Sequence, residues 1–315
     1  MSRVAAAFQL GEVVDCRPVT TGVMNQSWRL RTTIGTYAIK QLRDRPVADV
    51  RAAQALMPPL AARGFPVAEG SVARVDSDWY AAHAWLPGSH FRGSSFSLEA
   101  CARFGEMIGR LHRELGSLCS PPPAAVPDSP PADARLALEK YATIAPVDDF
   151  DRLARREIAW RRELLLEHAA GRPPDREIAP GGWTHGDLQP FNLLTVGDRI
   201  TGILDWDRLG VRPYGLEVVR TATICFSTGD QTGLDLGRAA AFAQGYRRRI
   251  PLTDAELADA ADRRWWTLLT ETWPLRRHYD EGDRSCDHLF TRRGAFLRWW
   301  TAHRAEVVAA LTTPG

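Results

Sequence analysis

The sequence has little of what nucleic-acid, membrane or secreted proteins usually need. Lysine and arginine number 40 against 38 acidic residues, so the formal net charge is only +2, and no strong field attracts the chain to nucleic acid or to a membrane surface. No apolar run approaches the length of about eighteen residues that spans a membrane, and residues 1–16 lack a long apolar core. We therefore expect a cytoplasmic protein that neither binds nucleic acid nor enters a membrane.

Cysteine is also scarce and scattered along the chain. The cysteines are odd in number, and none of them forms a C-x-x-C pair that could begin a zinc or redox site. This spacing favours free thiols in a reducing compartment over disulfides. The five residues are Cys16, Cys101, Cys119, Cys225 and Cys286.

The pattern along the 315 residues favours two lobes. Residues 1–88 contain short β-rich runs around one helix, expected over 47–64 and interrupted by Pro58 and Pro59. After "WLPG" at 85–88 the pattern turns helical, with a core-facing helix from the N-cap Ser97 to Gly116. Residues 117–133 are rich in proline and serine and predict a mobile connector, and further helices are expected near 133–145 and 151–170.

One stretch, "WTHGDLQPFNLLTVGDRITGILDWDR" at 183–208, contains a β-hairpin pattern that places polar groups together. Two β-rich runs flank Gly197-Asp198, which is a two-residue turn sequence. If the pairing continues without interruption, Asn192 lies opposite Ile203, and Asp205 lies roughly 7 Å further along the strand. An amide oxygen and a carboxylate are hard ligands that suit Mg²⁺. The hairpin end therefore predicts half of a magnesium site at Asn192 and Asp205.

The same stretch carries the spacing of a kinase catalytic loop. Asp187 precedes Asn192 by five positions in "HGDLQPFN". In kinases this spacing lets one loop hold the substrate hydroxyl at the aspartate and the metal at the asparagine. We expect Asp187 mainly to orient the attacking hydroxyl and His185 to brace the loop by hydrogen bonding. Asp207 is either a further polar group near the metal or a surface residue.

At these residues the sequence resembles the aminoglycoside phosphotransferase and choline kinase family, which also includes homoserine and methylthioribose kinases. The resemblance rests on "HGDLQPFN" followed by the aspartate of "ILDWD", and it covers nearly the whole chain. It implies an α+β, bilobal, protein-kinase-like fold, with a small β-rich nucleotide-binding lobe over 1–88 and a larger, mainly helical lobe over 89–315. It also implies ATP and Mg²⁺ as cofactors.

The resemblance extends to a nucleotide site in the first 88 residues. "TTGVMNQSWRL" is similar to the phosphate loop of the family, "YAIKQL" to the strand whose lysine reaches the phosphates, and "AAHAWLPG" to the hinge that contacts adenine. The positions implied are Gly22, Asn25, Gln26 and Ser27 in the loop, Lys40 on the strand, His83 as the gate residue, and the backbones of Ala84 and Leu86 at the hinge.

Two positions depart from the family pattern. Ala53 stands where the family helix usually carries a glutamate that pairs with the strand lysine, and Asp49 or Gln54 is proposed as its substitute. Gly215 in "RPYGLEVVR" stands at a position that is usually aspartate, so the local bracing there differs.

The acceptor site is expected after residue 250. A T-x-x-E capping box at Thr253 begins a helix that is expected to reach Trp273. One stripe of this helix contains Asp262, Trp266 and Trp273 and could hold an organic cation between aromatic faces and a carboxylate. The alternative is that these tryptophans pack in the core, as aromatic stripes at helical spacing usually do.

Three functions compete: an ATP-dependent small-molecule kinase, a protein kinase, and a catalytically silent nucleotide-binding protein. The chain lacks G-x-G-x-x-G and A-P-E and has "DWD" in place of D-F-G, which disfavours a protein kinase. The lysine, catalytic aspartate, asparagine and metal aspartate are all present, which disfavours a silent protein. We predict phosphoryl transfer to a hydroxyl of a small metabolite or antibiotic that carries an amine. The choice between ATP and GTP, and between resistance and metabolism, stays open.

Overall fold

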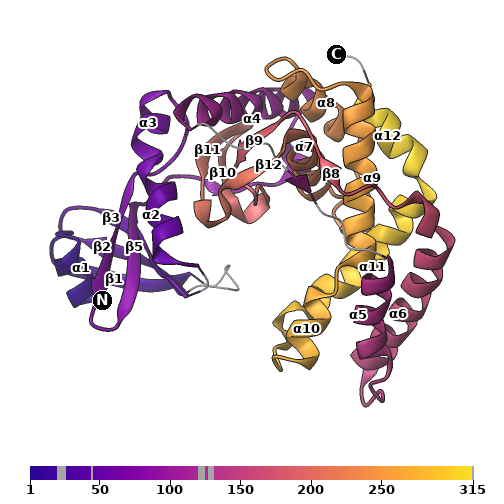
Figure 1. Ribbon diagram of the computed structural model, residues 1–315. Helices are drawn as coiled ribbons and strands as arrows, with labels where there is room; N and C mark the ends of the chain where they lie inside the picture. Colours follow the sequence, from indigo (N-terminus) through magenta and orange to yellow (C-terminus); the bar gives the residue numbers. More distant parts are fainter. Residues whose placement is uncertain (20–25, 44, 120–124, 127–130, 314–315) are drawn as a thin grey trace. The chain divides into compact units, whose positions relative to one another are not determined.

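The computed structural model describes residues 1–19, 26–43, 45–119, 125–126 and 131–313 (Figure 1). By its contacts the chain divides into two compact units. The first contains Met1–Ser95, Leu111–Ser120 and Trp183–Gly210, and the second contains Phe96–Arg110, Pro121–Gly182 and Val211–Gly315. These two units do not coincide with the lobes expected over 1–88 and 89–315, so the lobe boundary at residue 88 stays a prediction. Gly22, Asn25 and most of the connector expected over 117–133 lie outside the described residues.

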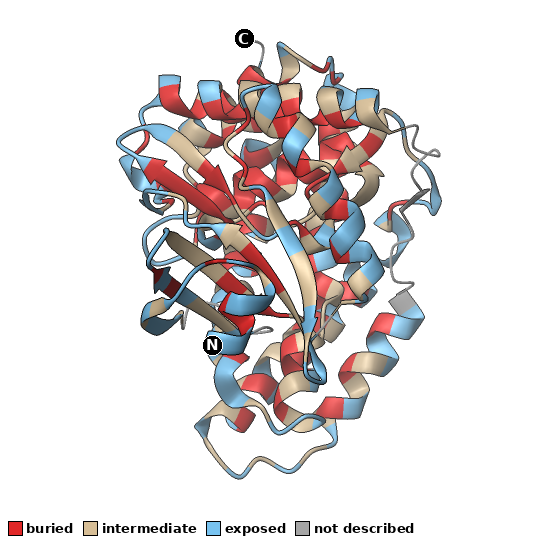
Figure 2. Cartoon of the chain, turned by 90° about the vertical axis from the view of Figure 1, so that its left-hand side faces the viewer, coloured by how far each residue is buried: buried red, intermediate tan, exposed pale blue. Residues whose placement is uncertain are grey.

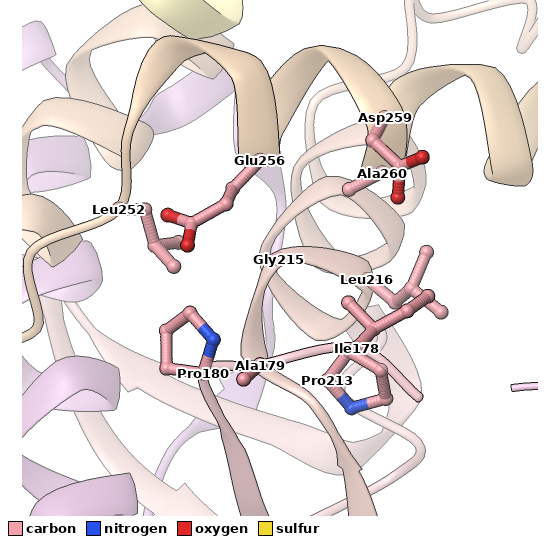
Figure 3. A pocket seen from close by; sticks show the side chains of 10 residues that line it. All are labelled: Ile178, Ala179, Pro180, Pro213, Gly215, Leu216, Leu252, Glu256, Asp259 and Ala260. Carbon is pink, nitrogen blue, oxygen red and sulfur yellow. The ribbon is translucent and has the colours of Figure 1, made fainter. Parts of the chain in front are cut away.

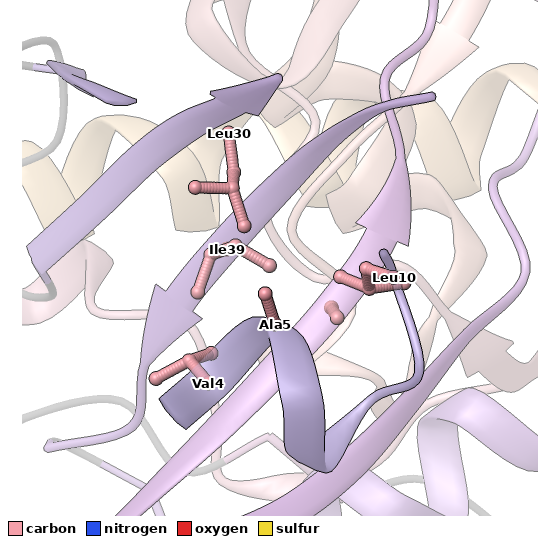
Figure 4. Packing of buried hydrophobic residues seen from close by; sticks show 6 residues of the cluster. Val4, Ala5, Leu10, Leu30 and Ile39 are labelled. Carbon is pink, nitrogen blue, oxygen red and sulfur yellow. The ribbon is translucent and has the colours of Figure 1, made fainter. Parts of the chain in front are cut away.

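A five-stranded antiparallel sheet with the strand order β1-β2-β3-β5-β4 forms much of the first unit. In β2 and β3 alternate residues are buried, and Leu30 and Ile39 are both 0% exposed. Val4 and Ala5 of the short helix α1 pack in the same apolar cluster (Figure 4). The elements are α1 Ser2–Ala7, β1 Val13–Val19, β2 Gln26–Thr32, β3 Thr36–Gln41, β4 Gly70–Val75 and β5 Asp78–Ala84.

Two short helices, α2 (Val47–Ala55) and α3 (Met57–Ala62), occupy the segment where one interrupted helix was predicted. The break falls just before Pro58 and Pro59, which cannot donate the backbone hydrogen bonds of a continuous helix. Gly64 follows α3 at φ +79°, a conformation that glycine adopts without steric cost. The predicted interruption and stop are therefore confirmed.

The predicted hairpin forms as β10 (Leu193–Val196) and β11 (Arg199–Ile203), with Gly197 in the turn at φ +59°. The predicted pairing of Asn192 with Ile203 is wrong. The register shifts midway along the hairpin, as at a β-bulge, so Ile203 pairs with Leu193, and Asn192 instead accepts a hydrogen bond from the N–H of Leu204 (2.8 Å). The strand β6 (Ser89–His90) completes this small sheet, and the 3-10 turns η1 (Gly93–Ser95), η3 (Pro190–Asn192) and η4 (Trp206–Arg208) flank it in the chain.

The long helix α4 (Leu98–Leu118) has the predicted N-cap and apolar stripe. The Ser97 hydroxyl accepts a hydrogen bond from the N–H of Ala100 (3.1 Å). The helix continues two residues beyond the predicted end at Gly116. Residues 98–110 belong to the second unit and 111–118 to the first. The predicted core positions were Leu98, Cys101, Phe104, Ile108, Leu111 and Leu115. The last five are buried, but the prediction is wrong for Leu98, the first residue of the helix, which is 57% exposed.

The second unit is mainly helical. Its elements beyond α4 are β7 Ala125–Val126, α5 Pro131–Ala142, α6 Asp149–Glu167, η2 Ala169–Gly171, β8 Arg176–Glu177, α7 Tyr214–Cys225, α8 Leu236–Arg247, α9 Asp254–Thr270, α10 Trp273–Tyr279, η5 Arg284–Cys286, α11 Asp287–Ala302 and α12 Arg304–Thr312. Two further strands, β9 Gly181–Thr184 and β12 Gly210–Pro213, each contain residues of both units. Most residues of α7 are buried, in keeping with its packing against α8 and α9. Figure 2 shows the burial of each described residue along the chain. No helix in the described part of the chain has the length and apolar character needed to cross a membrane.

Close packing of α4 against α8 depends on two glycines. A Cβ atom at Gly105 would lie 1.9 Å from the carbonyl oxygen of Phe242, and one at Gly245 would lie 1.9 Å from that of Ala102. No side chain fits at such distances, so the two backbones meet at these positions.

The helix α9 begins with the predicted capping box, in which Thr253 and Glu256 bond each other's backbone N–H groups. It ends at Thr270, however, and not at Trp273. Trp273 begins the separate helix α10, in which Pro274 occupies the first turn.

Candidate active site

The loop between β9 and β10 is held in place by His185, which is completely buried. Its Nε2 donates to the carbonyl oxygen of Leu204 (2.9 Å), and its Nδ1 accepts from the N–H of Asp187 (3.2 Å). The ring also packs edge-on against Trp206, with 4.7 Å between centroids. These contacts fix one tautomer and tie the loop to the end of β11, which is the bracing role expected of His185.

Asp187 and Asn192 lie on this loop and contact each other directly. Asn192 Nδ2 donates to the backbone oxygen of Asp187 (2.9 Å) and to its Oδ2 (3.1 Å), and Gln189 Nε2 donates to the same Oδ2 (3.0 Å). Two amide donors on one carboxylate oxygen fix its rotation. Because Nδ2 of Asn192 faces Asp187, the Oδ1 atom of Asn192 points in another direction.

Lys40 on β3 contacts two acids that follow β11. Its Nζ donates to Asp205 Oδ1 (2.8 Å) and to Asp207 Oδ2 (2.5 Å). The two acids can meet one ammonium because Asp205 adopts a left-handed conformation (φ 59°, ψ 69°) and opens the 3-10 turn η4. Neither Asp49 nor Gln54, the substitutes proposed from the sequence, provides this partner.

The charges of this cluster stabilise one another. Burial alone would lower the pKa of Lys40, but the carboxylates of Asp205 and Asp207 outweigh it and raise the pKa. Burial alone would raise the pKa of Asp205, but Lys40 lowers it. Lys40 and Asp205 are therefore both charged at neutral pH.

Gln54 contacts His83, the residue expected at the gate of the nucleotide site, instead of Lys40. Gln54 Nε2 lies 2.5 Å from His83 Nε2, and since an amide nitrogen only donates, the imidazole accepts. Burial, helped by the charge of Lys40, lowers the pKa of His83 to about 4. His83 is thus neutral at physiological pH.

The other described residues of the expected nucleotide site lie on the same sheet, except Leu86, which follows it in the chain. Strand register places Ser27 opposite Lys40, and Gln26 at the start of β2 accepts a hydrogen bond from Arg43 (3.2 Å). Ala84 ends β5, and Leu86 follows it two residues later. The structure therefore brings Ser27, Lys40, Asp187, Asn192 and Asp205 into one compact unit.

The donor atoms of Asn192 and Asp205 fit a Mg²⁺ ion. Among the described residues, no three histidine, cysteine, aspartate or glutamate side chains group as a complete metal site. Mg²⁺, however, usually binds one or two protein oxygens together with substrate phosphates and water. Asp205 provides a carboxylate whose side chain is 42% exposed, and Asn192 provides an amide oxygen that faces away from Asp187.

The residues expected to recognise the acceptor belong to the second unit. Trp266 is only 1% exposed, so the structure supports core packing for its ring and not contact with an acceptor. Asp262 forms an ion pair with Arg304 (2.6 Å), and the guanidinium of Arg293 lies 5.2 Å from the ring centroid of Trp273. The predicted stripe is also interrupted, because Trp273 lies on α10 and not on α9.

Gly215 lies at the start of α7, against α9. A Cβ atom at Gly215 would lie 3.2 Å from the Cβ of Ala260, so the two helices pack closely at this position. A small pocket beside it has a volume of about 10 Å³, room for about one water molecule, and is too small for an acceptor (Figure 3). The pocket is lined by Ile178, Ala179, Pro180, Pro213, Gly215, Leu216, Leu252, Glu256, Asp259 and Ala260.

The sheet of the first unit, the mainly helical second unit and the braced loop are those of a protein-kinase-like fold. A profile of the phosphotransferase enzyme family matches residues 15–252, and the chain belongs to this family. Among curated relatives, the homoserine kinase of Gluconobacter oxydans (strain 621H) is 28% identical over 306 residues, which cover 92% of this chain and 91% of that protein. The homoserine kinase of Bradyrhizobium sp. (strain ORS 278) is 27% identical over 79% of this chain and 76% of that protein.

Solved structures show the same fold at lower sequence identity. A spectinomycin phosphotransferase in complex with ADP and spectinomycin has a TM-score of 0.66 and 11% identity, with 94% of this chain and 92% of that chain covered. The choline kinase from Cryptosporidium parvum Iowa II has a TM-score of 0.58 and 12% identity, with 96% and 92% covered. The predicted family and fold are therefore confirmed, and this chain is a small-molecule kinase whose acceptor provides a hydroxyl group.

Proposed function

We propose that this enzyme transfers the γ-phosphoryl group of ATP to a hydroxyl of a small, amine-containing metabolite, with Asp187 at the acceptor and Lys40, Asn192 and Asp205 at the nucleotide. The observation that carries the proposal is the cluster in which Lys40 meets Asp205 while Asn192 holds Asp187 on the adjoining loop. These are the groups that a kinase needs to position a hydroxyl and a triphosphate together.

In this proposal Asp187 orients the acceptor. The acceptor oxygen attacks the γ-phosphorus, the bond from that phosphorus to the bridging oxygen breaks, and ADP leaves with the bonding electron pair. The hydroxyl proton passes to Asp187 or to water. Gln189 and Asn192 fix the carboxylate of Asp187, so the attacking oxygen is positioned before reaction.

Asn192 and Asp205 would hold Mg²⁺, which neutralises negative charge on the phosphate oxygens when it is bound. Lys40 contributes a second positive charge from the sheet. The three acids Asp187, Asp205 and Asp207 carry −3 and Lys40 carries +1, a sum of −2 when all are ionised, which suits a divalent cation.

Homoserine is the first acceptor to test, because the curated relatives with that name cover up to 92% of this chain. It carries both the hydroxyl and the amine predicted for the acceptor. Choline, spectinomycin and aminoglycosides belong in the same panel, because proteins with those activities share the fold. A cytoplasmic location is part of the proposal.

The proposal is tested by incubating the protein with ATP and Mg²⁺ and each acceptor, followed by mass spectrometry. We expect one acceptor to gain a single phosphoryl group as ADP forms. Asp187→Asn should lower kcat by about 10² to 10⁴ while nucleotide binding is retained. Gln189→Ala is the matched control on the same loop, and its loss should be smaller because Asn192 still holds the carboxylate.

Three results would contradict the proposal. If no acceptor is phosphorylated and the protein does not bind ATP, the nucleotide site is assigned incorrectly. If Asp187→Asn turns over at the wild-type rate, Asp187 has no part in the reaction. Phosphorylation of generic protein substrates but of no small molecule would point to the protein kinase alternative.

A further inference from the structure

Lys40 has two acidic partners, and one of them is also the proposed metal ligand. Lys40 contacts Oδ1 of Asp205, and a divalent cation bound to the other oxygen would share the charge of the same carboxylate, so the ion pair between Lys40 and Asp205 would weaken. Lys40 therefore needs a second anchor if it is to keep its position when the metal is bound. The helix α2 provides no such anchor, since its position 53 is alanine.

Asp207 has the geometry of that anchor. Its carboxylate lies 2.5 Å from Lys40 Nζ, and its side chain is 13% exposed, against 42% for Asp205. An ion pair with little access to water is screened less than an exposed one. Of the two acids, Asp205 is the one open to a ligand from solvent, and Asp207 is the one buried beside the lysine.

The turn that carries Asp207 is fixed from both sides. The indole Nε1 of Trp206 donates to the carbonyl oxygen of Ile203 (3.0 Å), and its ring packs against the buried His185. The turn η4 also contacts α2, the helix that has Ala53 where a glutamate was expected. Asp207 thus reaches Lys40 from a rigid turn beside the helix that lacks the acid.

We propose that Asp207 is the positioning residue for Lys40 and takes the place of the missing helix glutamate, so that Asp205 is released to the metal while Lys40 stays in place. This inference rests on the proposed function, because it assumes that Lys40 meets the nucleotide phosphates. It assigns to one short turn two tasks, metal binding at its first acid and lysine positioning at its second.

The inference predicts that Asp207 acts only through Lys40, which a double-mutant cycle measures. Dissociation constants for ATP with Mg²⁺ are determined by calorimetry for the wild type, Asp207→Asn, Lys40→Ala and the double variant. Asp207→Asn should weaken binding about fivefold or more when Lys40 is present. In the Lys40→Ala background the same change should leave binding unchanged or strengthen it, because only a repulsive negative charge is then removed.

The metal makes the test sharper. In EDTA, Asp205 remains available to Lys40, so Asp207→Asn should have a smaller effect on ATP binding than with Mg²⁺ present. Asp207→Asn should likewise lower kcat/KM for ATP when Lys40 is present and should not lower it in the Lys40→Ala background. Asp207→Glu, which keeps the carboxylate, should restore binding to within about threefold of the wild type and shows that the charge is responsible.

Asp198→Asn is the matched control, since Asp198 is an exposed acid on the β10–β11 turn of the same unit, and its binding should stay within about twofold of the wild type. Thermal unfolding of each variant establishes that it is folded. Equal effects of Asp207→Asn with and without Lys40 would overturn the inference and leave the proposed function standing. A wild-type protein that binds no ATP in either condition would remove the proposed function, and the inference with it.

Discussion

The buried His112 on α4 predicts a specific dependence of stability on pH. His112 is completely buried, and burial, together with the neighbouring His185, lowers its pKa to about 3. The folded protein therefore keeps this imidazole neutral, whereas in the unfolded chain it is protonated below its ordinary pKa of about 6.5. Stability from this group is complete above pH 6.5 and is lost as the pH falls toward the folded pKa.

The size of the effect follows from proton linkage. Between the two pKa values the unfolded state binds one more proton than the folded state, so the free energy of unfolding falls by about 1.4 kcal/mol per pH unit. From pH values well above 6.5 down to pH 4.5 the loss from His112 is about 2.7 kcal/mol, a large part of the stability of an ordinary domain. His83, with a pKa of about 4, contributes in the same direction.

The assay is urea unfolding of the wild type and His112→Leu between about pH 7.5 and 4.5. The variant removes the titrating group but keeps a side chain of similar size, so its free energy of unfolding should fall less steeply, by about 1.4 kcal/mol per pH unit below pH 6.5. The comparison of slopes does not depend on any constant cost of the substitution. His288→Leu, at an exposed histidine, is the control and should leave the slope unchanged. Parallel curves for wild type and His112→Leu would refute the reasoning.

Two further predictions test the metal site and the helix packing. Asp205→Ala should shift the Mg²⁺ activation curve to higher concentration more than Asn192→Ala does, because a carboxylate contributes formal charge and an amide does not. Identical curves for Asp205→Ala and the wild type would exclude the assignment of Asp205 as a metal ligand. Gly105→Ala should lower the free energy of unfolding by about 1 to 3 kcal/mol, because its Cβ would meet the carbonyl oxygen of Phe242. Gly171→Ala is the control and should change this free energy little, because a Cβ there has nothing within 4 Å. Equal urea midpoints for the two variants would contradict the packing described for α4 and α8.

The sequence by itself determined the features that depend on neighbouring residues. Gly197-Asp198 predicted the hairpin turn, Thr253 and Glu256 predicted a helix start, and the adjacent prolines predicted a break, because each of these is decided within a few residues. The loop "HGDLQPFN" is equally local, so its asparagine and aspartate could be paired from spacing alone. The resemblance built on these residues led to the correct family and fold.

Only the tertiary structure decided which distant groups meet. Lys40 pairs with acids 165 and 167 residues away, and the sequence suggested Asp49 or Gln54 because only their helix was known to lie near. The second acid of "DWD", Asp207, was a hint of this partner, but the direction in which its side chain points depends on the left-handed backbone at Asp205. Likewise, a helical stripe gives the same periodicity whether it faces solvent or neighbouring helices, so packing alone revealed that Trp266 is buried. Short-range rules fix turns and caps, whereas partners across the fold depend on contacts that no local pattern specifies.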